Sequence, residues 1–290
     1  MKFKDAIEII RPINCIMGAF TVIIGILNTR TGISIEILLI NLILGILTYF
    51  FIAGSGMVIN DIYDIEIDKI NRPERPIPRG SITLKQAKIL FLIILTIGVA
   101  LSIIHSIIFN LGFLNIVFAM LFGFLGWVYA KWGKKQGFLG NLVVSLSFSI
   151  GLIYGAILNS SIIPLYIYYF FLTCFFLLLS REIIKGCEDI EGDKQYGIKT
   201  LAIQIGIEKT AKFSVVCDIL AIIFFSLPIF TPIINPILFF ISMIFGIIIV
   251  IYALILSLKS DLQTADFKKI SLFLKLGAFL GLIAFIFASI

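Results

Sequence analysis

The apolar stretch EILLINLILGILTYFFIAGSGMVI (residues 36–59) runs directly into NDIYDIEIDKINRPERPIPRG (residues 60–80). The first stretch exceeds the about 20 residues that a helix needs to cross a bilayer. The second begins with three aspartates, Asp61, Asp64 and Asp68, and continues with lysine, arginine and proline residues. A membrane-spanning helix that ends in acidic residues and a basic loop predicts a polar site at one membrane surface.

The apolar character extends along the whole chain. Hydrophobic residues make up 60% of the sequence, charged residues 14%, and the mean hydropathy is +1.12, whereas about a quarter of the residues of a soluble domain are charged. Apolar runs of spanning length recur at 13–30, 36–59, 86–107, 110–129, 138–158, 162–180, 211–230, 234–257 and 268–289. We therefore predict an all-α, polytopic membrane protein with nine transmembrane helices in a single domain over residues 1–290.

The basic residues predict the orientation of the chain. The N-terminal segment and the loops after the second, fourth, sixth and eighth runs hold 22 of the 23 lysines and arginines, and Arg30 lies on the other side. The positive-inside rule then places the N-terminus and these loops in the cytoplasm and the C-terminus outside the cell membrane. The net charge of +6 follows from this orientation, so no nucleic-acid partner is expected. His105 and four scattered cysteines lack the spacing of a zinc or haem site.

Two acidic clusters point to an internal duplication. Asp64 and Asp68 have the same spacing as Asp189 and Asp193, which lie 125 positions further along the chain. The stretches TLKQAK (83–88) and IEKTAK (207–212) are similar at an offset of 124. A duplicated unit of four helices leaves the two copies parallel in the membrane, with a ninth helix added. Both acidic clusters are therefore expected at the same membrane surface.

The spacing of the acidic residues predicts a site for a hard cation. On a helix that continues from 36–59, residues at intervals of four share one face. Carboxylates stacked in a low-dielectric wall repel one another unless cations lie between them. Oxygen ligands without histidine or cysteine favour Mg²⁺ over Zn²⁺. The alternative is a set of solvated loop charges, which the recurrence of the spacing argues against. The oxygen-bearing residues in question are Asn60, Asp61, Asp64, Asp68, Asp189 and Asp193.

At these residues the sequence resembles the UbiA superfamily of intramembrane prenyltransferases. Residues 60–80 are similar to its first motif, NDxxDxxxD followed by a basic, proline-rich loop, and DIEGD (189–193) is similar to its second, DxxxD. YAKWGKK (129–135) resembles the family's tyrosine-plus-lysine motif, and RPINC (11–15) its N-terminal RPxN. The order of these motifs and their places in the loops extend the resemblance over nearly the whole chain.

The resemblance implies Mg²⁺-dependent transfer of a prenyl group from an isoprenoid diphosphate. The six oxygen-bearing residues would bind Mg²⁺, and four of them would be catalytic: Asp64, Asp68, Asp189 and Asp193. The departing diphosphate would be bound by Lys134, Lys135, Arg72, Lys185 and Tyr129. Further substrate contacts would come from Asn14, Arg11, Arg75 and Arg79.

The identity of the prenyl acceptor follows from a narrower resemblance. Short loops and the pairing of REIIKGCEDIEGD (181–193) with YAKWGKKQGFLGN (129–141) resemble most the archaeal members of the family. This resemblance implies transfer of a geranylgeranyl group to geranylgeranylglyceryl phosphate, a lipid acceptor drawn from the bilayer. An aromatic acceptor such as 4-hydroxybenzoate or a naphthoate is the alternative. A CDP-alcohol phosphotransferase would need a DGxxAR run, which is absent, and a transporter would place its acidic residues near the bilayer midplane.

Overall fold

The computed structural model describes residues 2–109, 112–160, 162–195 and 197–290, with only the backbone at 70–71, 134–135, 192 and 195. The described chain is helical, and eight helices are long and apolar enough to cross a membrane. A ninth span is formed if α1 (Phe3–Ile10) and α2 (Pro12–Leu27), which are bent by 49°, count as one. The predicted all-α polytopic fold is therefore confirmed.

The remaining helices follow the predicted runs closely. Their bounds are α3 (Ile35–Tyr63), α4 (Ile65–Asn71), α5 (Leu84–Phe109), α6 (Leu114–Lys131), α7 (Phe138–Ser149), α8 (Gly151–Ile157), α9 (Leu165–Glu188), α10 (Ile190–Gln195), α11 (Leu201–Ile205), α12 (Ile207–Ser226), α13 (Pro236–Ser257) and α14 (Thr264–Phe287). The fifth predicted run is split into α7 and α8, which together make one span. Short 3₁₀ turns occupy Gly133–Gln136 and Leu227–Phe230.

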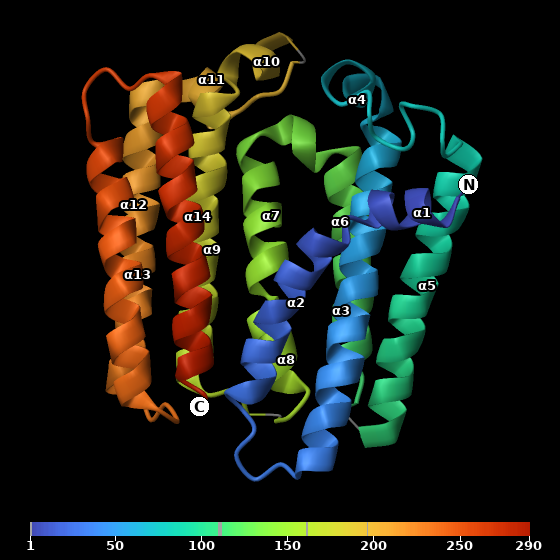
Figure 1. Cartoon of the computed structure of the whole chain (residues 1–290), viewed down its shortest axis with the longest axis vertical. Helices are drawn as coiled ribbons and strands as arrows, with labels where there is room; N and C mark the ends of the chain where they lie inside the picture. The colour runs from blue at the N-terminus through green and yellow to red at the C-terminus, as the bar shows by residue number, and fades with distance from the viewer. Residues whose placement is uncertain (1, 110–111, 161, 196) are drawn as a thin grey trace.

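The helices lie side by side in one bundle (Figure 1). The short helices α4, α10 and α11 lie at one end of the bundle, and the C-terminus lies at the other. Helix α1 crosses the bundle near the end that carries α4. Both acidic motifs are therefore at the same end, as expected for parallel copies of a duplicated unit.

The two acidic motifs also share a backbone conformation. The long helix α3 ends just before Asp64 (φ −89°, ψ 3°), and α9 ends just before Asp189 (φ −95°, ψ 11°). The N–H of Asp68 donates to the Asp64 carbonyl at 2.8 Å, and the N–H of Asp193 donates to the Asp189 carbonyl at 2.9 Å. The prediction of one continuous helix through Asp68 is therefore wrong, because each helix breaks at an aspartate. Helical hydrogen bonds nevertheless meet at each break, because the N–H of Asp64 also donates to the Asn60 carbonyl at 2.9 Å and that of Asp189 to the Lys185 carbonyl at 3.0 Å.

Close backbone contact joins α2 to α8. A Cβ atom on Gly25 would lie 2.2 Å from the carbonyl oxygen of Leu152, and one on Gly155 would lie 2.2 Å from that of Val22. Small residues allow such approach between membrane helices, where dispersion contacts replace the hydrophobic driving force. The glycines thus hold α2 firmly against α8.

A buried polar network fixes the helices at the end opposite the aspartates. The Nε2 atom of His105 on α5 is 2.8 Å from Oδ1 of Asn41 on α3. The amide of Asn41 donates to Oδ1 of Asn159 at 2.7 Å, and the amide of Asn159 donates to the carbonyl of Ile26 at 2.8 Å. His105 and Asn41 are buried. These bonds tie α2, α3 and α5 to the chain that follows α8.

Candidate active site

The first acidic cluster is buried and compensated by arginines. Asp61, Asp64 and Asp68 have exposed fractions of 1%, 8% and 4%. Nη1 of Arg75 lies 3.3 Å from Oδ1 of Asp61 and 2.5 Å from Oδ2 of Asp68. Arg11 forms a second ion pair with Asp61. Carboxylates can persist at such burial because guanidinium groups neutralise them and donate hydrogen bonds.

Arg11 reaches Asp61 from a strained backbone position. It has left-handed dihedral angles (φ 53°, ψ 64°) at the break between α1 and α2, and Pro12 follows as the first residue of α2. The left-handed region costs a residue with a side chain roughly 1–3 kcal/mol. Proline disfavours a helical conformation in the residue before it, so the RPINC sequence accounts for the break. The break places the Arg11 side chain beside Asp61 and Met57.

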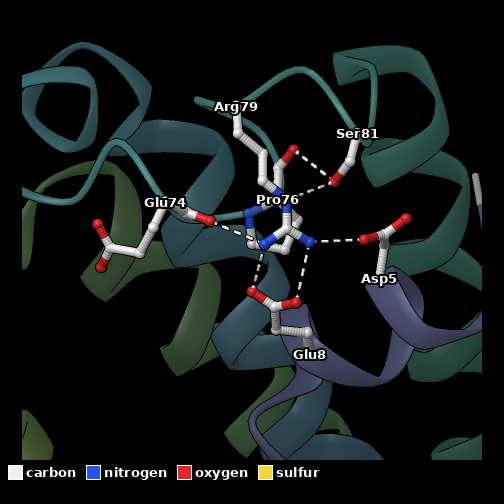
Figure 2. A network of polar contacts seen from close by, with 6 residues as sticks. All are labelled: Asp5, Glu8, Glu74, Pro76, Arg79 and Ser81. Carbon is white, nitrogen blue, oxygen red and sulfur yellow. Dashed lines mark hydrogen bonds and ion pairs between the residues drawn. The ribbon is translucent and has the colours of Figure 1, made fainter.

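Arg79 clamps α1 onto the loop that follows α4 (Figure 2). Its two terminal nitrogens each donate to a Glu8 carboxylate oxygen at 2.9 Å, and Nη2 also lies 2.5 Å from Oδ1 of Asp5. Nη1 donates to the Glu74 carbonyl at 2.8 Å, and Nε donates to Ser81 Oγ at 3.1 Å. The carboxylates of Glu8 and Asp5 raise the pKa of the Arg79 guanidinium. The clamp holds α1, and with it the position of Arg11.

Like Arg11, two more arginines predicted to contact substrate are engaged within the protein. Arg75 pairs with Asp61 and Asp68, and Arg79 pairs with Asp5 and Glu8. Direct contact of either arginine with substrate stays a prediction. The structure places both where they support the first acidic cluster, Arg75 by charge and Arg79 through α1.

The second acidic cluster is more open. Asp189 is exposed and Asp193 is half-buried, at the junction of α9 and α10. Within the described residues, no three carboxylate, histidine or cysteine side chains lie close enough together to bind a metal ion. Mg²⁺ usually takes one or two protein carboxylates and fills its shell with water and substrate phosphate. Two separate carboxylate clusters at one end of the bundle fit ions shared with a bound diphosphate.

A cavity of about 700 Å³ lies inside the bundle. Side chains of α2, α3, α6, α7, α8, α9 and α14 line it, most of them aliphatic or aromatic. Gly56 on α3 faces open space, since a Cβ atom there would meet nothing within 4 Å. Met17 on α2 and Phe279 on α14 line the cavity and are also exposed, so the cavity reaches the surface of the bundle beside these helices.

Besides four hydroxyl side chains (Thr48, Tyr49, Ser147 and Tyr154), six polar or charged side chains bear on the chemistry of this apolar cavity. Three belong to the predicted site: Asn14, Asn60 and Tyr129. The other three were not predicted as site residues: Arg181, Glu182 and Lys275. Nη1 of Arg181 lies 2.7 Å from Oε1 of Glu182. Lys275 falls inside the predicted run 268–289, and a lysine within a membrane-spanning run is the sequence signal that could have identified it.

Other predicted site residues lie outside the cavity. Of the six predicted metal ligands, Asn60 alone is in the cavity wall that the structure describes. Nζ of Lys185 is 3.8 Å from Oε2 of Glu182, which connects it to the charged part of the wall. Arg72 is exposed in the loop after α4. The side chains of Lys134 and Lys135 lie outside the described residues.

Comparisons with known proteins agree on one family. The pattern of the UbiA prenyltransferase family matches residues 18–285. The digeranylgeranylglyceryl phosphate synthase of Sulfurisphaera tokodaii is 35% identical over 274 residues, covering 92% of this chain and 91% of the relative. The corresponding synthase of Methanocaldococcus jannaschii is 35% identical over 300 residues, covering 100% and 97%.

Solved structures agree with these relatives. A structure of a digeranylgeranylglyceryl phosphate synthase superposes with a TM-score of 0.83 at 32% identity, over 99% of this chain and 98% of the other. A UbiA homolog from Archaeoglobus fulgidus bound to DMAPP and Mg²⁺ has a TM-score of 0.72 at 17% identity, over 97% and 99%, and so shares the fold. The chain belongs to the UbiA prenyltransferase family.

Proposed function

We propose that this protein transfers a geranylgeranyl group from geranylgeranyl diphosphate to geranylgeranylglyceryl phosphate, forming digeranylgeranylglyceryl phosphate. The observation that carries the proposal is the similarity to synthases of this name along the full length of the chain, at 35% identity or more in several archaea. The apolar cavity with a polar wall segment is consistent with an isoprenoid substrate that carries a charged head.

The reaction replaces one C–O bond by another. The bond between C1 of the donor and its diphosphate breaks, and the electron pair leaves with the diphosphate. The acceptor hydroxyl oxygen then bonds to C1 and releases its proton to a nearby base. Because negative charge develops on the leaving group, preorganised cations near the diphosphate give the largest stabilisation. A cavity that excludes water protects the allylic cation from hydrolysis.

In this proposal the acidic clusters bind Mg²⁺, and the basic residues around them orient the carboxylates or contact the diphosphate. Mg²⁺ would be held by Asn60, Asp61, Asp64, Asp68, Asp189 and Asp193, and when bound it would supply positive charge against the diphosphate. Arg11 and Arg75 orient Asp61 and Asp68 by direct ion pairs. Arg72, Lys134, Lys135 and Lys185 remain the proposed diphosphate contacts. Tyr129 and Asn60 would face the reacting end of the prenyl chain from the cavity wall.

Transfer assays with purified protein test the proposal. The protein in non-ionic detergent is incubated with Mg²⁺, radiolabelled geranylgeranyl diphosphate and, in parallel, geranylgeranylglyceryl phosphate, 4-hydroxybenzoate or a naphthoate. We expect product with the glycerol phosphate, and nearly none after chelation of Mg²⁺. The Asp64→Asn and Asp189→Asn variants should remain monodisperse and lose nearly all transfer. Efficient prenylation of an aromatic acceptor, with geranylgeranylglyceryl phosphate ignored, would refute the acceptor while leaving the family unchanged.

A further inference from the structure

Lys275 is a charged residue placed inside a membrane-spanning helix. It lies eleven residues after Thr264, the first residue of α14, which is about 16 Å along the helix axis. The hydrocarbon core of a bilayer is only about 30 Å thick. The other lysines of this helix, Lys268 and Lys269, lie within its first two turns. The Lys275 side chain is exposed at this depth, and a basic residue within a membrane span usually marks a binding or transport site.

The Lys275 side chain lines the cavity and lacks a protein partner. It shares the cavity wall with Leu272, Leu276 and Phe279 of the same helix. Among the described residues, no carboxylate lies within ion-pair distance of Lys275 and no acceptor is hydrogen-bonded to it. By contrast, Lys259 pairs with Asp266 at the start of α14, and Lys269 lies over the ring of Tyr252 at 5.8 Å.

Arg181 on α9 adds a second cation to the same wall. Its Nη1 pairs with Glu182, while its Nε is buried and has no hydrogen-bond partner among the described residues. Since Arg181 and Glu182 neutralise each other, Lys275 leaves the charged part of the wall with a net positive charge. Next to the apolar wall of the cavity, this charge favours an anion.

The anion is better matched to the acceptor than to the donor. Half of the proposed donor site, the first acidic cluster, lies on α3 and α4, and the other half follows α9, whereas Lys275 lies in the middle of α14, which packs on α9, α13 and α2. Lys275 lies on the side of the cavity that reaches the bundle surface beside α2 and α14. A lipid acceptor that enters from the bilayer passes this side.

We propose that Lys275, assisted by Arg181, binds the phosphate group of the acceptor lipid. The inference rests on the proposed function, because it assigns a phosphate to the acceptor. Unlike Arg75 and Arg79, which are predicted substrate contacts but pair with Asp61, Asp68, Asp5 and Glu8, Lys275 forms no ion pair among the described residues. Binding at this position would hold the acceptor so that its hydroxyl faces the reacting end of the donor.

The test compares two acceptors that differ only in the phosphate. Values of kcat/KM are measured for geranylgeranylglyceryl phosphate and for geranylgeranylglycerol with wild-type protein, Lys275→Gln, Lys275→Arg and Lys268→Gln. A charge-assisted hydrogen bond is worth about ten- to a hundredfold in binding. We expect Lys275→Gln to reduce the preference for the phosphorylated acceptor by that factor. Lys275→Arg should retain most of the preference. Lys268→Gln, which removes a charge from the same helix outside the cavity, should leave it unchanged.

A binding measurement separates this inference from the proposed function. The dissociation constant of geranylgeranylglyceryl phosphate is measured without donor, and it should rise in Lys275→Gln by the same factor. If Lys275→Gln keeps the wild-type preference and affinity, the inference is wrong. A rise in the KM for geranylgeranyl diphosphate instead would assign Lys275 to the donor and also refute it. If wild-type protein binds the glycerol phosphate but does not prenylate it, the proposed function fails, and the dissociation constants alone decide the role of Lys275.

Discussion

At the scale of single residues, Arg75 is one of two arginines that compensate the charge of the first acidic cluster. It contacts two buried carboxylates, Asp61 and Asp68, and its own side chain is 15% exposed. Removing one partner of a buried ion pair leaves uncompensated charge and costs about 3 kcal/mol or more. We predict that Arg75→Gln lowers the unfolding temperature in detergent. Added Mg²⁺ should restore part of the loss, because a divalent cation replaces the missing positive charge.

Thermal unfolding with and without Mg²⁺ checks this prediction. Lys69→Gln is the matched control, because Lys69 and Glu66 form an exposed pair with exposed fractions of 51% and 78%. Such surface pairs contribute little to stability, so Lys69→Gln should unfold like the wild type. An Arg75→Gln variant with wild-type stability, or with no extra response to Mg²⁺, would show that the cluster does not depend on Arg75.

At the scale of helices, the contact between α2 and α8 holds one wall of the cavity. A Cβ atom at Gly25 would lie 2.2 Å from the carbonyl oxygen of Leu152, so the helices must move apart to accept it. Overpacking of this kind typically costs about 1–3 kcal/mol. We predict that Gly25→Ala lowers the unfolding temperature. Gly56→Ala, with nothing within 4 Å of the added atom, should not lower it. Equal unfolding temperatures for the two variants would contradict the close contact.

The helix breaks at Asp64 and Asp189 are also decided at this scale. The repeated spacing of four predicts which carboxylates share a face, and in the structure helical hydrogen bonds end and begin again at the aspartate of each break. No residue in the local sequence predicts the break, because the isoleucine that follows each aspartate is compatible with a helix. The short helices α4 and α10 that follow the two breaks lie at the same end of the bundle (Figure 1).

At the scale of the whole molecule, the distribution of basic residues predicts which end faces the cytoplasm. We propose that the end carrying α4 and α10 is cytoplasmic, as the positive-inside rule requires. Single cysteine substitutions test this in intact cells. One replaces Glu74 in the loop after α4, and the other replaces Ile162 in the loop before α9; both residues are exposed. A membrane-impermeant maleimide should label Ile162→Cys directly and Glu74→Cys only after permeabilisation. The four native cysteines are buried, so their background should be low. The reverse pattern would invert the orientation.

The sequence by itself determined the membrane class, the spans, the two acidic motifs and the family. These properties depend on the length and polarity of local runs and on spacings of four or of 125 residues, all of which can be read directly from the linear sequence. Exact breaks within spans, such as the one between α7 and α8, were missed because a short bend hardly changes the apolar character of a run.

Only the tertiary structure decided which charges meet. Arg11 pairs with Asp61 across 50 positions, and Arg79 pairs with Asp5 across 74. Lys275 and Arg181 share one cavity although they lie on different helices far apart in the chain. The physical reason is that a helix exposes each side chain in a direction fixed by its rotation about its own axis. That rotation is set by packing against neighbouring helices, which no local pattern of residues specifies.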